Sequence, residues 1–332
     1  ELGYRDVTVD ELGNVVGYFG DGPPRLMYNG HLDHVPPAGM DDPYGAQIVD
    51  GHLRGRGSLD MKASLAAAAF AAALVDAPLR SSYVFTADVR EEVDGPEGIA
   101  ALLASGLRAD FGVSGEATSL DIALGHRGKV QLDVTILGRS SHAASPCDGE
   151  NAVYAAAPFL AALEREAERL PSDRLLGDAS LTVTGISSNP TGDVAVVPSS
   201  CTIRIDRRYI RDETPDSCRA AIEDLVARVA AENGARATVE LVNVYPLMIT
   251  EPNSPIVAAA TAAVEEATGR RPALKAWRFG VNATWMNAAG IPSVGLGPGE
   301  EHLAHTPDER VPIGEVLDVC RAYAQLIGRL CA

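Results

Sequence analysis

The sequence predicts an α/β domain that is interrupted by an inserted α+β domain. In the first third of the chain, short strand-like runs alternate with helical runs, which is typical of a parallel sheet flanked by helices. Between Lys129 and Pro246 the order becomes strand, helix, strand, strand, helix, strand. From about Thr250 onward, helices and strands alternate again. One domain is therefore expected from both ends of the chain and a second domain from its middle.

The elements of the first domain are predicted from apolar runs of two lengths. Short runs rich in β-branched and aromatic residues indicate strands, and longer runs rich in alanine and leucine indicate helices. The strands are expected at 25–29, 82–89 and 111–114, and the helices at about 61–75, 96–105 and, near the C-terminus, 313–330.

The order of elements in the middle of the chain is that of the split ferredoxin-like unit. Such a unit forms an antiparallel sheet that two helices cover on one face. Its strands are expected at 130–138, 179–186, 201–209 and 237–244, and its helices at 151–170 and 214–232. The predicted division is 1–127 with 247–332 for the first domain and 128–246 for the inserted domain.

Composition and charge exclude several classes of partner. The chain of 332 residues is 46% hydrophobic and 22% charged, as in soluble globular proteins. A net charge of −17 argues against nucleic acid or an anionic membrane, because both require basic patches. The longest apolar stretch, 65–75, is too short to span a bilayer, and no signal peptide is visible. The odd number of cysteines without CxxC spacing predicts reduced thiols in a cytoplasmic protein. These are Cys147, Cys201, Cys218, Cys320 and Cys331.

Residue types that ligate metals follow the predicted strands of the first domain. Open α/β sheets bind their ligands at the carboxyl ends of the strands, so these residues are candidates for one site. They are His31 and Asp33 after 25–29, Asp60 at the start of the alanine-rich helix, Glu91 and Glu92 after 82–89, Glu116 after 111–114, and His305 after a glycine-rich strand end at 295–299.

Each of these residues alone has an ordinary explanation. A loop histidine such as His31 is more often a surface residue than a ligand, Asp60 could be a helix N-cap, and Glu91 with Glu92 could be a solvated pair. Together, two histidines, three carboxylates and a spare glutamate match two divalent metals and a general base. Carboxylates favour metal pairs because one carboxylate can bridge two cations.

The motifs around these residues resemble the dinuclear zinc peptidases and deacylases. That family includes glutamate carboxypeptidase, succinyl-diaminopimelate desuccinylase, acetylornithine deacetylase and aminoacylase. The matching motifs run in family order along nearly the whole chain. They are Gly30-His31-Leu32-Asp33, Gly55-Arg56-Gly57-Ser58-Leu59-Asp60-Met61-Lys62, Glu91-Glu92, Gly115-Glu116, Gly125-His126-Arg127-Gly128 and Ala304-His305-Thr306-Pro307-Asp308-Glu309. The resemblance implies a phosphorylase/hydrolase-like catalytic domain and an inserted ferredoxin-like lid domain that commonly mediates dimerisation.

The resemblance also implies a role for each candidate residue. Asp60 would bridge two divalent ions, expected to be zinc, with cobalt or manganese as alternatives. The pair His31 and Glu116 would complete one metal site, and the pair Glu92 and His305 would complete the other. Asp33 would support His31, and Glu91 would be the general base that activates a metal-bridging water and then protonates the leaving amine.

Three residues of the inserted domain are further candidates by the same resemblance. His142 matches a histidine that reaches a partner subunit's active site and stabilises the developing oxyanion. Arg208 matches an arginine that pairs with a substrate carboxylate, which guanidinium binds well in bidentate fashion. The neighbouring Arg207 could be that reader or an ordinary surface charge.

The sequence departs from the family pattern at several positions. Ala195 stands where an asparagine often precedes Val-Val-Pro, and Asn282 stands where many members have aspartate, which implies altered recognition of the polar end of the substrate. The chain begins at Glu1 without an initiator Met, whereas family members carry a few dozen residues before the segment matching 4–16. The runs 205–209 and 277–282 resemble a branch linked to selenium metabolism, whose substrates are poorly defined.

The function expected from these observations is metal-dependent hydrolysis of an amide bond next to a carboxylate, in an N-acyl amino acid or at a peptide C-terminus. Two alternatives stay open, a dipeptidase and a catalytically inactive protein that binds a carboxylated small molecule. The expected partners are a small-molecule or short-peptide substrate and a second copy of the chain, with no nucleic acid and no membrane.

Overall fold

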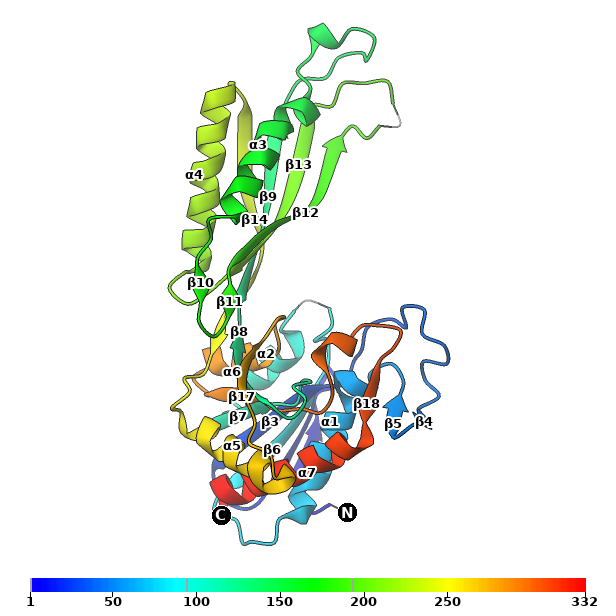
Figure 1. Cartoon of the computed structure of the whole chain (residues 1–332), viewed down its shortest axis with the longest axis vertical. Coiled ribbons are helices and arrows are strands. Elements are labelled where there is room, and N and C mark those ends of the chain that lie inside the picture. Colours follow the sequence, from blue (N-terminus) through cyan, green and yellow to red (C-terminus); the bar gives the residue numbers. More distant parts are fainter. Residues whose placement is uncertain (1, 94, 193) are drawn as a thin grey trace. The chain divides into compact units, whose positions relative to one another are not determined.

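The computed structural model describes residues 2–93, 95–192 and 194–332 of the chain (Figure 1). The contacts within it divide the chain into two compact units. Unit 1 comprises Glu1–His126 and Met248–Ala332, and unit 2 comprises Arg127–Leu247. The chain passes from one unit to the other after His126 and after Leu247, and each position lies one residue from the boundary expected from the sequence.

Unit 1 is built on a nine-stranded sheet within the described residues. The order is β1 (Arg5–Val9), β2 (Val15–Phe19), β6 (Ser82–Asp88), β3 (Pro24–His31), β7 (Phe111–Ser114), β17 (Ser293–Gly295), β8 (Ile122–His126) and β15 (Met248–Ile249), with β16 (Leu274–Trp277) also paired to β8. The four adjacent strands β6, β3, β7 and β17 are parallel to one another. Their carboxyl ends therefore meet at one edge of the sheet.

Helices cover both faces of this sheet (Figure 1). One face carries α1 (Ala63–Ala71), α5 (Pro255–Thr268) and α7 (Ile313–Cys331), and the other carries α2 (Glu97–Ala104) and α6 (Ala283–Ala288). Alternate side chains of β3 enter the two layers, as the period of a strand requires. Met27 packs in the core cluster with Met286 of α6, whereas the Tyr28 hydroxyl bonds to Ser64 Oγ at 2.9 Å under α7. Because helices cover both faces, consecutive residues of β3 (Leu26, Met27 and Tyr28) are all buried and do not alternate with polar residues.

The helix expected from about Met61 begins two residues later, at Ala63. The preceding segment Ser58–Lys62 is an irregular turn in which Asp60 has φ −118° and ψ 86°, outside helical geometry. The N-cap of α1 is Lys62, so the interpretation of Asp60 as an N-cap is wrong. The turn instead holds Asp60 ahead of the helix.

A second, small sheet of unit 1 was not expected from the sequence. It has the order β18 (Arg310–Pro312), β5 (His52–Arg54) and β4 (Gln47–Val49). Its strands are three residues long, and two of them pair across about 250 residues of sequence, which leaves no local pattern to read. Short helical turns complete the unit at η2 (Ala72–Leu74) and η4 (Glu301–Leu303).

Unit 2 has the predicted ferredoxin-like architecture. Its sheet has the order β12 (Ser180–Asn189), β13 (Ser200–Tyr209), β9 (Gly128–Leu137) and β14 (Arg236–Tyr245), with every neighbouring pair antiparallel. Helices α3 (Ala152–Ala167) and α4 (Pro215–Asn233) pack on the buried face of the sheet against alternate residues of β9. A hairpin of β10 (Ser172–Asp173) and β11 (Gly177–Asp178) and the turn η3 (Pro146–Asp148) lie in the connections.

The ends of α4 show why the sequence places this helix accurately. Thr214 and Ser217 form a capping box at its N-terminus, and Pro215 occupies the first helical turn. Gly234 follows the last turn with a φ of 62°, the left-handed conformation that glycine adopts without strain. The observed helix begins and ends one residue later than expected.

Two further expectations can be compared with the structure. All five cysteines are free thiols. Among the described residues, no helix combines the length and the apolar character that crossing a membrane requires.

Candidate metal centre

The candidate ligands of unit 1 converge at the shared edge of the parallel strands. His31 is the last residue of β3, Glu92 lies in the turn after β6, and Glu116 lies two residues beyond β7. His305 comes from the loop after β17, and Asp60 comes from the turn before α1. The five residues predicted as metal ligands are thus brought together from five separate segments.

Asp60 contacts both histidines, each through a different carboxylate oxygen. His31 Nε2 lies 2.9 Å from Asp60 Oδ1, and His305 Nε2 lies 3.0 Å from Asp60 Oδ2. Glu116 Oε1 is 3.5 Å from His31 Nε2, and Glu92 Oε2 is 3.1 Å from His305 Nε2. The donors therefore form two groups that share Asp60, which is the arrangement a bridging carboxylate requires.

The negative charge of the carboxylates raises the pKa of both histidines. Hydrogen bonding to Asp60 and then to Glu92 raises the pKa of His305 to about 10, although burial opposes this. Burial also lowers the pKa of His31, but its bonds to Asp33, Asp60 and Glu116 hold it well above the usual value. In the absence of metal, the protonated imidazoles supply the positive charge that the carboxylates require.

Asp33 connects His31 to the Glu91–Glu92 turn. His31 Nδ1 donates to the backbone oxygen of Asp33 at 3.0 Å, which leaves Nε2 to face Asp60. The Asp33 carboxylate accepts the backbone N–H of Glu91 at 3.3 Å and that of Glu92 at 3.1 Å. Burial raises the pKa of Asp33, but the bonds from His31 and these N–H groups outweigh it and lower the pKa to about 2. Asp33 is therefore an anion that fixes two segments of the site.

Glu91 lies among the same carboxylates without belonging to either histidine group. Burial raises its pKa well above the usual value; the charge of His31 opposes this rise, and the charges of Glu116 and Asp60 add to it. Cations bound between these carboxylates would offset the negative charges and lower the pKa of Glu91. Its placement suits a group that takes up and releases a proton.

Asn282 is buried beneath the site. Its Nδ2 donates to Asp88 Oδ2 at 2.9 Å, and Asn29 Nδ2 donates to the same oxygen at 3.1 Å. Burial raises the pKa of Asp88 to about 7 despite these bonds. One N–H of the Asn282 amide is thus used by Asp88, and a contact between Asn282 and substrate stays a prediction. Asp88 was not singled out from the sequence, since an aspartate ending a strand carries no signal of burial.

His142 is exposed in unit 2. Its Nδ1 accepts the backbone N–H of Ala144 at 3.0 Å, which places the proton of the neutral ring on Nε2. The segment is anchored by a bridge between His142 and Val196 and by a bond from Ala143 N–H to the Ala195 oxygen at 3.0 Å. Nε2–H is therefore available as a donor to solvent or ligand.

The two candidate arginines on β13 differ in environment because adjacent strand residues face opposite sides. Arg207 lies on the helix-covered face with a side chain that is only 5% exposed, and it pairs with Glu213. Arg208 is 27% exposed and pairs with Asp206, with Nε 2.6 Å from Oδ1. Of the two, Arg208 is the more accessible, and carboxylate recognition by either stays a prediction.

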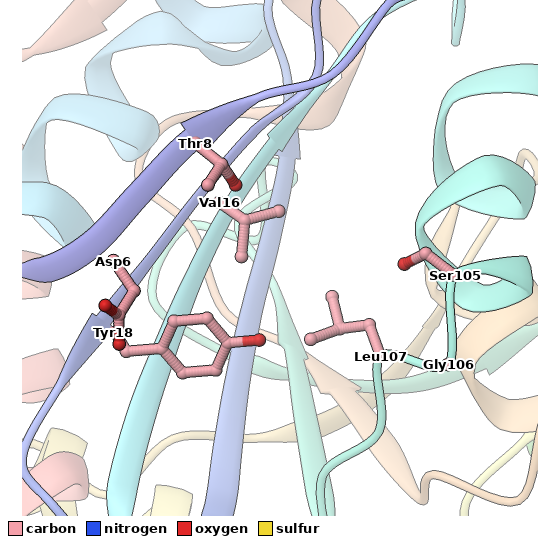
Figure 2. Close-up of a pocket in the computed structure, with 7 residues that line it drawn as sticks. All are labelled: Asp6, Thr8, Val16, Tyr18, Ser105, Gly106 and Leu107. Atoms are coloured by element: carbon pink, nitrogen blue, oxygen red, sulfur yellow. The ribbon is translucent and has the colours of Figure 1, made fainter.

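A pocket elsewhere in unit 1 shares no residue with the predicted site. It has a volume of about 330 Å³ and lies between the β1–β2 hairpin and the segment after α2 (Figure 2). The residues that line it are Asp6, Thr8, Val16, Tyr18, Ser105, Gly106 and Leu107. These residues offer neither a histidine nor a pair of carboxylates, so the pocket lacks the donor set of the candidate metal centre.

Comparison with known proteins identifies the family of the chain. The model of Peptidase family M20/M25/M40 matches residues 27–329. The protein YgeY of Escherichia coli K12 is 31% identical over 350 residues, which cover 98% of this chain and 86% of YgeY. Succinyl-diaminopimelate desuccinylase of Acidiphilium cryptum is 32% identical over 336 residues, covering 96% of this chain and 86% of that enzyme.

Solved structures share the fold over nearly the whole chain. Aminopeptidase PepT from Bacillus cereus has a TM-score of 0.80 at 24% identity, covering 98% of this chain and 89% of PepT. The YXEP protein of Bacillus subtilis, described as a dinuclear metal binding peptidase, has a TM-score of 0.72 at 16% identity, covering 97% and 87%. The chain belongs to peptidase family M20/M25/M40 and is a hydrolase, as the resemblance of its motifs predicted.

Proposed function

We propose that this hydrolase uses two divalent cations to cleave an amide bond next to a carboxylate. The observation that carries the proposal is the position of Asp60 between two histidines, with one carboxylate oxygen on each. Each of these ring nitrogens also contacts a second carboxylate, Glu116 for His31 and Glu92 for His305. A cluster with only a structural role would not need this shared arrangement around one buried aspartate.

The chemistry of the donor set fits divalent metal ions. Each group offers one imidazole nitrogen and carboxylate oxygens, which are ligands of zinc, and carboxylate-rich sets also accept cobalt or manganese. The atoms of His31, Asp60 and Glu92 that could bind an ion all lie within 4.8 Å of one another. Two such cations, when bound, polarise the scissile carbonyl and make an attacking water acidic near neutral pH.

Glu91 is the proposed proton carrier of the reaction. Its carboxylate would accept the proton of the attacking water and then donate it to the leaving amine. Asp33 positions this group, because its carboxylate holds the backbone N–H groups of Glu91 and Glu92 while its backbone oxygen holds His31. One anion thus sets the distance between the base and the ligands.

The proposed substrate is an N-acyl amino acid. Support comes from the desuccinylase relatives, which align along almost the whole chain. Arg208 is the proposed reader of the substrate carboxylate, because it is the more accessible of the two arginines on β13. His142 is the proposed donor to the oxyanion. Its Nδ1 accepts the backbone N–H of Ala144, which leaves Nε2–H to donate to the substrate.

A homodimer formed through unit 2 is also proposed. β12 is an edge strand of ten residues, and edge strands present unpaired backbone groups to other chains. Ile186 on this strand is 54% exposed, and Tyr154 on the adjacent helix α3 is 79% exposed. A second copy of the chain would cover both side chains.

The proposal is tested with a panel of N-succinyl, N-acetyl and N-carbamoyl amino acids and simple dipeptides. Released amines are measured by mass spectrometry for metal-loaded protein, chelator-treated protein and Glu91→Gln. Release from an acyl amino acid that depends on both metal and Glu91 supports the deacylase assignment. Release from dipeptides alone identifies a dipeptidase, and tight binding of a panel member without turnover identifies an inactive binding protein.

A further inference from the structure

A buried ion pair between Arg56 and Glu309 lies directly behind the candidate metal ligands. The Arg56 side chain is 1% exposed and that of Glu309 is fully buried, and Arg56 Nη1 contacts Glu309 Oε2. Among the described residues, the hydrogen bonds of the two side chains go to each other and to backbone groups, and none goes to the side chain of a candidate ligand. Burying two charges costs free energy unless further hydrogen bonds satisfy them. The other hydrogen bonds of this pair therefore show which segments of the chain it holds in place.

The free oxygen of Glu309 fixes the turn that carries Asp60. Glu309 Oε1 accepts the backbone N–H of Leu59 at 3.1 Å and that of Asp60 at 3.2 Å. The turn departs from helical geometry at Asp60, so these two N–H groups are not used in a helix. A charged acceptor therefore holds the backbone at the residue whose two oxygens must face different histidines.

The free donors of Arg56 fix two other segments. Arg56 Nη2 donates to the Thr306 backbone oxygen at 3.1 Å, next to His305, and to the Pro37 backbone oxygen at 3.2 Å. Thr306 belongs to the loop that presents His305, and Pro37 belongs to the segment that follows His31 and Asp33 along the chain. One guanidinium thus ties together the loops on both sides of Asp60.

From these contacts we infer that Arg56 and Glu309 are positioning residues that set the distance between Asp60 and His305. The inference rests on the proposed function, because it assumes that these two residues share a cation. The group formed by Glu92, His305 and Asp60 depends on the pair through both Asp60 and Thr306. The group formed by His31 and Glu116 depends on it mainly through Asp60, so its cation is the less affected of the two.

The test is a cation titration of Glu309→Gln with a chromophoric chelator as competitor. Glutamine keeps the shape of the side chain and one acceptor oxygen but presents an uncharged amide to Arg56. We expect the two stoichiometric binding steps of the wild type to separate, with one step weakened about 10- to 100-fold, as is common when groups behind metal ligands are changed. The other step is expected to change less.

A matched control separates positioning from general loss of stability. Glu213→Gln disrupts another Arg–Glu pair, that of Arg207 in unit 2, which touches none of the metal ligands. It is expected to lower the melting temperature and leave both binding steps unchanged. Arg56→Lys serves as the second variant, since lysine keeps the charge but one ammonium cannot reach Glu309, Thr306 and Pro37 together.

The outcomes distinguish this inference from the proposed function. Failure of the wild type to bind two cations contradicts the proposed function itself. Binding of two cations by the wild type, with the same two affinities in folded Glu309→Gln or Arg56→Lys, overturns the positioning role alone. If Glu309→Gln does not fold, the binding steps of Arg56→Lys decide. Selective weakening of one step in either variant, without such weakening in Glu213→Gln, supports the inference.

Discussion

Filling the candidate metal centre near pH 7 should release at least two protons per chain. In the metal-free protein both histidines are held as imidazolium ions, His305 with a pKa of about 10 and His31 with a pKa well above its usual value. A histidine must be neutral to ligate a metal, so each cation displaces a proton. Asp60 holds both protons in place, because its oxygens lie 2.9 Å and 3.0 Å from the two rings.

The size of the effect on affinity follows from the pKa of His305. A proton held with a pKa of about 10 competes with the cation at pH 7 by a factor of up to about 1,000. The His305 side chain is 53% exposed, so solvent screening makes this an upper bound. For every proton displaced, the apparent affinity rises about tenfold per pH unit below the pKa of the group.

The assay is titration calorimetry of metal-free protein between pH 6 and 8 in buffers with different ionisation enthalpies. The slope of the observed enthalpy against the buffer enthalpy gives the number of protons released. Glutamine at this position keeps an oxygen that can ligate a cation but carries no titrating group. At saturating cation, His305→Gln should therefore release one proton fewer than the wild type. A wild-type count near zero, or the same count for His305→Gln, would refute the assignment of the histidines as ligands.

Three further predictions concern the proposed proton carrier Glu91, the anion Asp33 and the proposed dimer. Glu91→Gln should keep both cations and lose about 10²- to 10⁴-fold in kcat, measured with the best substrate of the panel; a near-normal rate would exclude Glu91 as the base. Asp33→Asn should lower the stability of the chelated protein by at most about 2 kcal/mol at pH 7 in urea unfolding, because solvent partly screens this half-buried carboxylate. Because the folded pKa of Asp33 is depressed, this difference should vanish as pH falls from about 4 toward 2, and a constant difference would contradict the linkage. Ile186→Lys should give monomers in light scattering, whereas Leu317→Lys, equally exposed on α7, should leave dimers intact.

Much of the fold could be predicted because local patterns and burial agree. β7 occupies the residues expected for it, and β13 differs by one residue, since both are apolar runs bounded by polar or turn residues. The start of α1 was misplaced because Met61 and Lys62 are good helix formers, although both lie in the irregular turn that carries Asp60. The backbone N–H groups of Leu59 and Asp60 in that turn donate to Glu309, 249 positions from Asp60, and no local pattern reveals such a partner.

The candidate site was likewise predictable only in part. Residue types and their order after strands predict which side chains converge, as His31 and Glu116 show. The sequence does not reveal which polar side chains bond to neighbouring protein residues instead of facing the site. Arg207 is buried against Glu213 and Asn282 donates to Asp88, and both facts depend on packing across strands and helices. Glu309 lay within a recognised motif, yet only its contacts show that it supports Asp60.

The central claim, hydrolysis by a pair of cations shared through Asp60, is tested most directly by restoring activity to chelated protein. Amine release from the best panel substrate is followed while zinc or cobalt is added in measured equivalents. The predicted result is negligible release without cation and a rate that reaches its plateau at two equivalents per chain. Full activity without added cation in exhaustively chelated protein, or a plateau at one equivalent, would contradict the dinuclear account.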